Sequence, residues 1–348
     1  MIDEKILDWV CLSNTAGIGS KTFWTLLNKY KTATEALNYV KNPFSKQKAK
    51  QILKSINYEI LLANDKDFPI ELKRSCSCPP MLFYKGDKSI LSKRKIGIVG
   101  ARNASIHGMK IARTLAEKLS SEFAIISGLA KGIDANAHVG SLECPENKSA
   151  IAVLPFSLEN VYPKENKNIY EKIAKYGLLI SEVFPYSVPE QGMFQGRNRL
   201  ISLLAQGMII IEAGVKSGTM STAKIALDYG CEVMAVPGSP LDPRYFGSNL
   251  LIKNGAPLIQ NYYDVIEVLG ADNRVPSQPP IETKKIIEKQ DNFEKYEKVL
   301  SVLSSTPVSI DLISKYVQIE IPELLRIISD LEILGKIIKY CANEIALA

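Results

Sequence analysis

Three loops in the middle of the chain combine small residues with a cation, the residue types that bind phosphate. They contain Gly100 and Arg102 in residues 100–105, Ser127, Gly128 and Lys131 in residues 127–134, and Lys216, Ser217, Gly218 and Thr219 in residues 212–219. Small residues let backbone N–H groups approach an anion, and each loop leads into a predicted helix whose N-terminus favours negative charge. For any single loop, plain turn glycines are the alternative interpretation. Because the loops are predicted to meet, we favour an anion site with Arg102, Lys131 and Lys216 as its cations.

A fourth segment, residues 194–199, places two arginines around an asparagine directly before the apolar stretch 200–204. The guanidinium groups of Arg197 and Arg199 suit phosphate binding, and the amide of Asn198 suits hydrogen bonding to a base edge. The alternative is a helix-capping asparagine whose neighbouring arginines pair with acidic residues. The position in a predicted loop before an apolar helix favours nucleic-acid binding.

The elements that would position these residues are short apolar runs separated by amphipathic helical stretches. The runs lie at residues 96–99, 124–126, 150–154, 178–180, 208–211 and 232–236. This alternation predicts an α/β fold with a Rossmann-like parallel sheet as its core. Right-handed crossovers place the carboxyl ends of the strands at one edge, where such sheets bind ligands. The candidate loops follow the first, second and fifth runs and therefore meet at this edge.

Pattern changes divide the chain into four regions. Residues 1–85 form a helical domain and connector, residues 86–270 the Rossmann-like domain, residues 271–290 a Pro- and Lys-rich linker, and residues 291–348 a winged-helix-like domain. Gly17-Ile18-Gly19 is similar to the hairpin of helix-hairpin-helix and sterile-alpha-motif-like modules, although an ordinary turn between helices also fits. Residues 323–330, the expected recognition helix, contain few cations, so protein contact and a weak accessory DNA role both stay open.

The composition limits the class of protein. The 348 residues are 46% hydrophobic and 23% charged, which is ordinary for a globular protein, and the net charge of +6 is compatible with a polyanionic partner. Six scattered cysteines and two histidines lack metal-site spacing, so we expect no metal and no cofactor. Without an apolar run of about 18 residues, and with Asp3 and Glu4 near its start, the chain is expected to be cytoplasmic and without membrane contact.

Four residues near the strand ends are expected to shape the pocket. Asp134 would cap a helix or orient Lys131, and His138 and Glu212 are interpreted as structural. Gly238 follows the sixth apolar run. Neither a G-x-G-x-x-G fingerprint with its acidic partner nor a G-x-x-x-x-G-K-[ST] loop is present, so dinucleotide binding and ATP hydrolysis have no support.

Six ordered motifs resemble those of the DNA-processing protein A family (DprA, also called Smf). They are V-G-A-R at 99–102, S-G-L-A-K-G-I-D at 127–134 with the histidine at 138, F-Q-G-R-N-R at 194–199, the segment 212–219, A-V-P-G at 235–238, and the segment 247–256 around Asn249. The chain departs from the family pattern where Ala101 replaces serine, Lys131 arginine and Gln195 proline. Pro155 and Ser157 replace two glycines, which puts close approach of an anion there in doubt.

The resemblance implies a non-catalytic protein. Members of the family bind and protect single-stranded DNA in natural transformation and load the RecA recombinase onto it as recombination mediators. They form homodimers through the Rossmann-like domain. The resemblance adds Asn249 to the expected DNA-binding residues, and Phe194, Tyr245 or Phe246 could stack an unpaired base.

Two other classes compete with this interpretation. Rossmann-like phosphoribohydrolases carry a catalytic glutamate in P-G-G-x-G-T-x-x-E, but Thr222 occupies that position here, so the usual general acid–base residue is missing. Glu212 and Asp134 stay open as substitutes, although structural roles at the strand ends are favoured for both. A protein-interaction module with a vestigial pocket is the second alternative, suggested by the lost glycines. The retained cations favour a DNA-binding pocket.

Overall fold

The computed structural model describes residues 2–144, 149–188, 192–270, 293–341 and 343–348. The chain divides into two compact units, Met1–Val275 and Pro276–Ala348. The predicted linker, residues 271–290, lies outside the described residues.

The first unit is built on an eight-stranded sheet with the order β1-β2-β6-β5-β4-β3-β7-β8. Six of its strands are parallel to one another and coincide with the six predicted apolar runs: β3 (Lys95–Gly100), β4 (Ala124–Ser127), β5 (Ala150–Val153), β6 (Leu178–Ser181), β7 (Gly207–Ile211) and β8 (Glu232–Ala235). The chain winds outward from β3 to β6 and then returns to add β7 on the other side of β3. The switch point of this doubly wound sheet therefore lies between β3 and β7, where such sheets open a crevice.

Two further strands, β1 (Glu59–Leu62) and β2 (Met81–Gly86), extend the sheet in antiparallel fashion beyond β6. The sequence pattern predicted irregular structure for this connector, partly because Pro79 and Pro80 directly precede β2. Prolines that precede the first residue of a strand remove no ladder hydrogen bond, so they do not prevent pairing. The connector thus belongs to the same sheet as the predicted Rossmann-like region.

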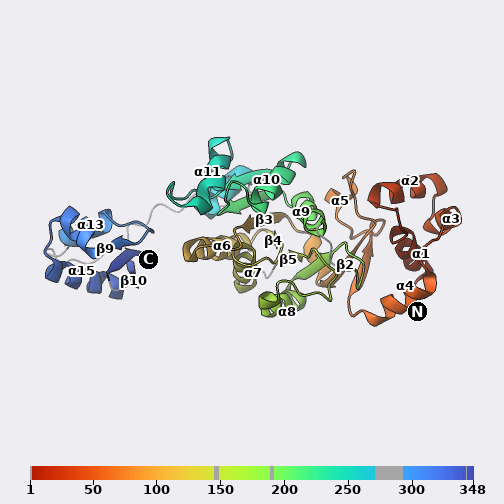
Figure 1. The fold of residues 1–348 in the computed structure, drawn as a ribbon, viewed down its shortest axis with the longest axis horizontal. Helices are drawn as coiled ribbons and strands as arrows, with labels where there is room; N and C mark the ends of the chain where they lie inside the picture. Colours follow the sequence, from red (N-terminus) through yellow and green to blue (C-terminus); the bar gives the residue numbers. More distant parts are fainter. Residues whose placement is uncertain (1, 145–148, 189–191, 271–292, 342) are drawn as a thin grey trace. The chain divides into compact units, whose positions relative to one another are not determined.

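Helices cover both faces of the sheet (Figure 1). Along this part of the chain they are α5 (Ile70–Lys73), α6 (Ile106–Leu119), α7 (Ile133–Glu143), α8 (Lys167–Tyr176), α9 (Met193–Leu204), α10 (Gly218–Asp228), α11 (Phe246–Lys253) and α12 (Tyr262–Leu269). Ile96 and Ile98 of β3 pack with α6 and α12, whereas Val99 belongs to the core that contains α9 and α10. Successive side chains of a strand point to opposite faces of the sheet, which explains why β3 contributes to both cores. Because both faces are buried, the strand sequences are continuously apolar.

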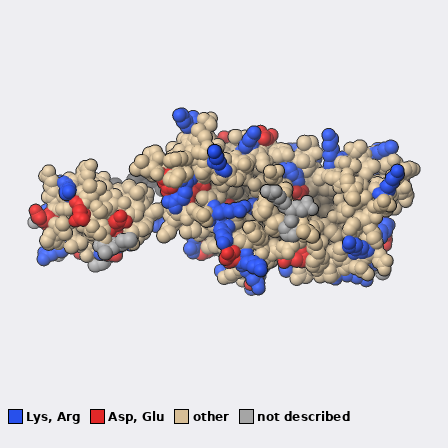
Figure 2. All heavy atoms as spheres, in the orientation of Figure 1, with Lys and Arg blue, Asp and Glu red and all other residues tan. Residues whose placement is uncertain are grey.

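Four helices precede the sheet: α1 (Glu4–Ser13), α2 (Ser20–Tyr30), α3 (Ala33–Leu37) and α4 (Lys46–Ser55). Trp9, Phe23 and Trp24 form their aromatic core, with ring centroids 5.1–6.0 Å apart. Gly17 takes a positive φ of 80° in the turn between α1 and α2. Basic side chains predominate over acidic ones on the visible face of this region (Figure 2).

The second unit contains α13 (Phe293–Ser301), α14 (Ile310–Val317) and α15 (Ile321–Ile333) with a small antiparallel sheet. The sheet has the order β10-β11-β9, formed by β10 (Ile337–Cys341), β11 (Glu344–Leu347) and β9 (Val308–Ser309). Ser309 caps α14 by accepting a hydrogen bond from the Leu312 N–H at 3.3 Å. Leu324, Ile328 and Ile345 are buried in its core. None of the described helices in either unit is long and apolar enough to cross a membrane.

A buried lysine ties the start of β3 to the connector. Lys95 is 2% exposed, and its Nζ donates to Glu71 Oε1 at 3.0 Å and to the carbonyl oxygens of Leu91 and Lys93 at 2.9 Å. Removing one partner of such a buried cluster leaves the remaining polar groups unsatisfied.

We therefore expect Lys95→Ala to lower the free energy of unfolding by about 2–4 kcal/mol. Urea unfolding of the variant measures this loss. Lys118→Ala, at an exposed position of α6, is the matched control and should change stability by less than about 0.5 kcal/mol. Equal stability of the two variants would contradict the structural role of Lys95.

Candidate functional site

A hollow of about 660 Å³ opens at the carboxyl ends of the parallel strands, at the switch point between β3 and β7. Its walls are the loop after β3, the first turns of α9 and the N-terminus of α10. A smaller hollow of about 100 Å³ shares Arg102, Ala130, Phe194 and Arg197 with it and continues toward the loops after β4 and β5. Together these hollows are called the sheet-edge pocket below.

The pocket brings together most of the residues predicted from the strand-end loops. Its lining includes Gly100, Arg102, Gly128, Lys131, Asp134, Arg197, Asn198, Ser217, Gly218 and Thr219. Lys216 is exposed directly beside Ser217. The loops that follow three different strands thus meet at one edge of the sheet, as the predicted topology requires.

Two buried side chains of opposite charge organise the wall formed by the loop between β4 and α7. Arg197 and Asp134 are 7% and 5% exposed. The guanidinium donates to the Gly128 carbonyl oxygen through Nη1, and Asp134 Oδ2 accepts from the Gly128 and Ala130 N–H groups at 3.2 and 3.4 Å. Burial raises the pKa of the Asp134 carboxyl, and the charge of Arg197 opposes that shift. Arg197 therefore fixes this loop and presents little free surface to a ligand.

Gly128 is required by this arrangement. A Cβ atom at position 128 would lie 1.5 Å from Nη1 of Arg197. The next residue, Leu129, takes a positive φ of 55°, which is uncommon for a branched side chain and is imposed here by the surrounding contacts. The small residue of the predicted loop thus makes room for a buried arginine.

Arg102 is the exposed cation of the pocket. Its guanidinium carbon lies 5.6 Å from the centroid of the Phe194 ring, and among the described residues no carboxylate lies within 4.0 Å of it. Lys131 pairs with Glu165 at 2.6 Å, but both side chains are more than half exposed, so this pair is weak. Both cations are therefore accessible to an anionic ligand.

An aromatic cluster flanks Arg102. Phe194 packs edge-on against Phe156 and Tyr162, with centroid distances of 5.4 and 6.0 Å. Tyr162 remains 45% exposed. Sequence reasoning proposed Phe194 as a stacking residue but missed Tyr162, although its position in the loop after β5 was a usable signal. Tyr245, another proposed stacking residue, is buried, and its ring fills the space where a Cβ of Gly238 would stand.

Arg199 does not line the sheet-edge pocket but a separate hollow beside Ser77 and Glu182. Residues 193–204 are helical, so the segment predicted as a loop is the start of α9. Residues two positions apart on a helix point about 200° apart, so Arg199 cannot face the same side as Arg197. Its guanidinium instead binds Glu182 and donates to the carbonyl oxygen of Ser77. Burial raises the pKa of Glu182, against the charge of Arg199.

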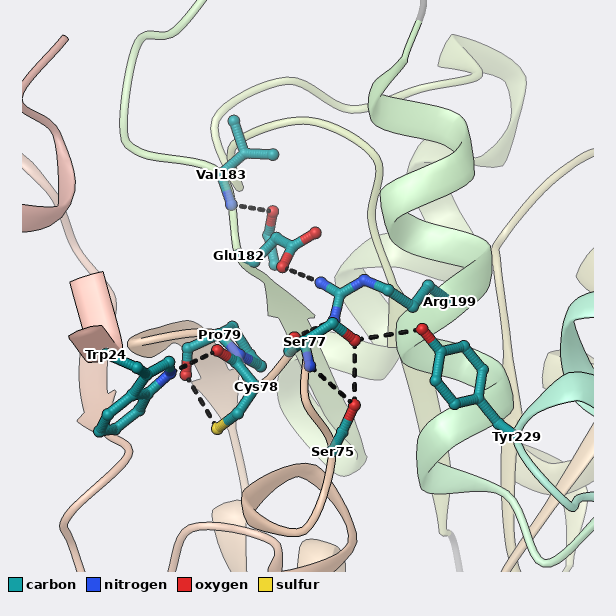
Figure 3. Close-up of polar contacts among 10 residues, drawn as sticks. Trp24, Ser75, Ser77, Cys78, Pro79, Glu182, Val183, Arg199 and Tyr229 are labelled. Atoms are coloured by element: carbon teal, nitrogen blue, oxygen red, sulfur yellow. Dashed lines mark hydrogen bonds and ion pairs between the residues drawn. The ribbon is translucent and has the colours of Figure 1, made fainter. Parts of the chain in front are cut away.

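This contact joins α9 to the connector and to the N-terminal helices. Ser77 Oγ lies 3.2 Å from the Tyr229 hydroxyl at the end of α10, and Trp24 Nε1 donates to the Cys78 carbonyl oxygen at 2.8 Å (Figure 3). The alternative interpretation from the sequence, an arginine paired with an acidic residue, is therefore the one that holds for Arg199.

The remaining predicted residues support the backbone around the pocket. Ser127 Oγ donates to the Ile98 carbonyl oxygen at 2.6 Å, Thr219 Oγ1 donates to that of Gly100 at 3.0 Å, and the Asn249 amide bonds both backbone groups of Gly238 at 2.9 and 3.1 Å. These hydrogen bonds position the strand-end loops. Asn249, predicted as a DNA-binding residue, thus holds the loop after β8.

Glu212 is buried at the end of β7 and holds the N-terminus of α6. Its Oε2 accepts from the Ser105 N–H at 2.8 Å, and Ser105 caps the helix by accepting from the Gly108 N–H at 2.9 Å. Glu212 itself takes a positive φ of 52°. A Cβ at position 108 would lie 2.5 Å from Glu212 Oε1, so Gly108 provides the space for this carboxylate.

His138 lies fully buried in α7, behind the pocket wall. Burial lowers the pKa of its imidazole to about 3, and the nearby positive charge of Arg197 acts in the same direction. The ring is therefore neutral at neutral pH, consistent with a structural role.

Comparison with known proteins identifies relatives of this fold and pocket. The sequence model of the family described as DNA recombination-mediator protein A matches residues 59–270, from the first residue of β1 to just past α12. The DNA processing protein DprA of Bacillus subtilis is 38% identical over 218 residues, which cover 62% of this chain and 73% of that protein. Protein Smf of Escherichia coli is 29% identical over 285 residues, covering 81% and 76% of the two chains.

Two solved structures resemble the fold closely. DprA from Streptococcus pneumoniae superposes with a TM-score of 0.67 at 27% identity, covering 77% of this chain and 98% of that one. DprA from Helicobacter pylori, whose structure describes a single-stranded DNA binding mode of that protein, gives a TM-score of 0.55 at 31% identity. That match covers 62% of this chain and 96% of the other.

The contact between Gly128 and Arg197 predicts a position-specific effect of adding one methyl group. We expect Gly128→Ala to destabilise the protein by about 2–3 kcal/mol, because the new Cβ displaces a buried guanidinium from its hydrogen bond with the Gly128 carbonyl oxygen. Thermal unfolding measures the loss. Gly218→Ala is the matched control, because no atom lies within 4 Å of a Cβ there, and its melting temperature should stay near that of the wild type.

The low pKa of His138 predicts a specific contribution to acid sensitivity. Because the folded pKa of about 3 lies below the ordinary value of 6.5, keeping the ring neutral favours the native state fully above pH 6.5. This contribution is lost as the pH falls from 6.5 toward 3. We expect His138→Gln to flatten the decline of unfolding free energy in this range. Parallel slopes for wild type and His138→Gln would contradict the assignment.

Proposed function

Because the chain belongs to the DNA recombination-mediator protein A (DprA) family, we propose that it binds single-stranded DNA in the sheet-edge pocket. The observation that carries the proposal is the exposed Arg102 beside the ring of Phe194. A cation without a carboxylate partner attracts phosphate, and an aromatic ring beside it offers a face to an unpaired base. Duplex DNA buries its base faces, so this combination favours a single strand.

The pocket supplies two kinds of contact to a strand. Arg102 and Lys131 neutralise phosphates, Lys131 by exchanging its weak pairing with Glu165. The exposed ring of Tyr162 stacks with a base, an interaction worth about 1–3 kcal/mol. Asn198 lines the same hollow and is placed to hydrogen-bond a base edge.

The N-terminus of α10 provides a further phosphate contact. This helix has 11 residues, and Ser217, Gly218 and Thr219 at its start line the larger hollow. Free N–H groups and the helix dipole favour an anion there, and Lys216 adds charge from the exposed side. Gly218 keeps the backbone accessible, because open space surrounds its Cα.

The substituted glycines of the family motif change how the loop after β5 contributes. Pro155 lines the smaller hollow and has no N–H to donate, and Ser157 is buried and accepts a hydrogen bond from Asn160 at 3.0 Å. Backbone binding of an anion at this loop is therefore disfavoured. We propose that the loop acts through Tyr162, so that the strand is held by stacking here and by charge on the α10 side.

We propose a binding role without catalysis. Asp134, the carboxylate that lines the pocket, is buried and accepts hydrogen bonds from two backbone N–H groups, which supports a role in holding the loop. As in the family resemblance, the strand would be protected and handed to the RecA recombinase during transformation, by a homodimer. The second unit is then a winged-helix-like accessory domain, and the N-terminal helices are sterile-alpha-motif-like.

Replacement of Arg102 tests the proposed site. We expect Arg102→Ala to weaken binding of a fluorescent oligothymidine about tenfold, and to reduce the slope of log K against log[salt] by about 0.7, the value for one lost phosphate contact with a single strand. Fluorescence anisotropy over a salt series measures both quantities.

Two arginines serve as controls for this experiment. Arg113→Ala removes an exposed guanidinium paired with Glu143, and Arg199→Ala removes the guanidinium bound to Ser77. Both should retain the wild-type salt slope, although Arg199→Ala should lower thermal stability. Unchanged binding by Arg102→Ala, or an equal change in Arg113→Ala, would place the DNA elsewhere.

A further inference from the structure

The positive charge of the chain is concentrated in its N-terminal helices. Residues 1–55 contain nine lysines and four acidic residues, a net charge of +5, whereas the whole chain has a net charge of +6. The other 293 residues are therefore almost neutral, with a net charge of +1. The helices α1 to α4, with the loops between them, are called the basic helical region below (Figure 2).

The lysines of the basic helical region are exposed and mostly lack acidic partners. All nine are exposed, and among the described residues only Lys46 has a carboxylate within 4.0 Å, those of Asp8 and Glu4. Lys46, Lys50 and Lys54 follow one another at four-residue spacing on α4. Like charges at this spacing destabilise a helix. Repulsion among these three lysines therefore weakens α4, and a polyanionic ligand would relieve it.

An aromatic stack lies within the same region. Tyr39 is 68% exposed, and one face of its ring stacks on Tyr30, with centroids 4.2 Å apart and planes within 11°. The ammonium group of Lys29 lies 4.9 Å from the Tyr30 centroid, and Lys31 and Lys41 are close in sequence. The high exposure of Tyr39 leaves its other face open to a planar group from solution.

We propose that the basic helical region is a second contact surface for the strand bound in the sheet-edge pocket, with lysines binding phosphates and Tyr39 stacking on a base. This proposal rests on the proposed function and extends the footprint of the strand along the first unit. Tyr39 is the only large apolar side chain that is exposed among the described residues of α1 to α4. A membrane surface would require more apolar contacts than one tyrosine, whereas an open aromatic face among lysines suits a single-stranded nucleic acid.

The test compares two charge-removing variants of the full chain. One carries Lys29→Gln, Lys31→Gln, Lys50→Gln and Lys54→Gln. The matched control carries Lys118→Gln, Lys172→Gln, Lys175→Gln and Lys224→Gln, four exposed lysines of α6, α8 and α10. Binding of oligothymidines of about 10 and about 40 nucleotides is measured over a salt series, because a short strand fills one site and a long one can reach a second.

The expected result is a loss confined to the long strand. The first variant should bind the long oligothymidine about tenfold more weakly, with a salt slope reduced by about 2, and should bind the short one as the wild type does. The control should match the wild type for both lengths. Equal loss in the control, or an unchanged affinity for the long strand, would overturn the proposal.

Tyr39 is tested separately from charge. Tyr39→Ala should weaken binding of the long oligothymidine about fivefold, whereas Tyr176→Ala, which removes a tyrosine of α8 that is 44% exposed beside Lys175, should not. Equal affinity of the wild type for duplex DNA, or binding to phosphatidylglycerol vesicles in place of oligothymidine, would overturn the assignment of a single strand.

Arg102→Ala, measured in parallel, separates this proposal from the proposed function. If Arg102→Ala binds both strands normally while the lysine variant loses the long strand, the sheet-edge site fails and the basic helical region stands as a DNA surface by itself. If Arg102→Ala loses both strands and the lysine variant loses neither, the sheet-edge site stands and the second surface is refuted.

Discussion

The loop between β4 and α7, held by the buried side chains of Arg197 and Asp134, is the constraint on which the pocket depends. Arg197 donates to the Gly128 carbonyl oxygen, Asp134 accepts from the Gly128 and Ala130 N–H groups, and the two opposite charges attract each other. Buried charges held in this way contribute little net stability, but removing one of them is costly, so they enforce one geometry. Gly128 follows from this requirement, because no larger residue leaves room for the guanidinium. The cation and aromatic ring of the binding surface are arranged around this fixed wall.

The sequence predicted the parallel sheet because its strands are buried on both faces and therefore appear as continuous apolar runs. It also predicted the edge at which the strand-end loops meet, since crossover handedness leaves little choice. The antiparallel strands β1 and β2 were missed, because four-residue and six-residue runs beside prolines carry too weak a signal. The family model matches residues 59–270 and therefore begins at β1, the first strand of the eight-stranded sheet.

The roles of individual side chains were less predictable than their location. Arg197 and Arg199 look equivalent in sequence, and only the helical start of α9 reveals that they face different neighbours. Polar residues and Gly196 made this helical turn resemble a loop. Likewise, Asn249 and Ser127 lie near the pocket, but their hydrogen bonds are made to the backbone. Motif position therefore located the pocket, whereas solvent exposure and hydrogen-bond partners determine which residues are available to a ligand.

The first turns of α9 carry arginines that bind two separate parts of the first unit. Through Arg197 the helix is attached to the loop at the pocket, and through Arg199 to the connector at Ser77, which lies next to the contact of Trp24 with Cys78. One helix thus connects the wall of the pocket with the connector. Any free energy by which a ligand in the pocket would restrain the N-terminal helices equals, by thermodynamic reciprocity, the free energy by which a ligand on those helices would strengthen binding in the pocket.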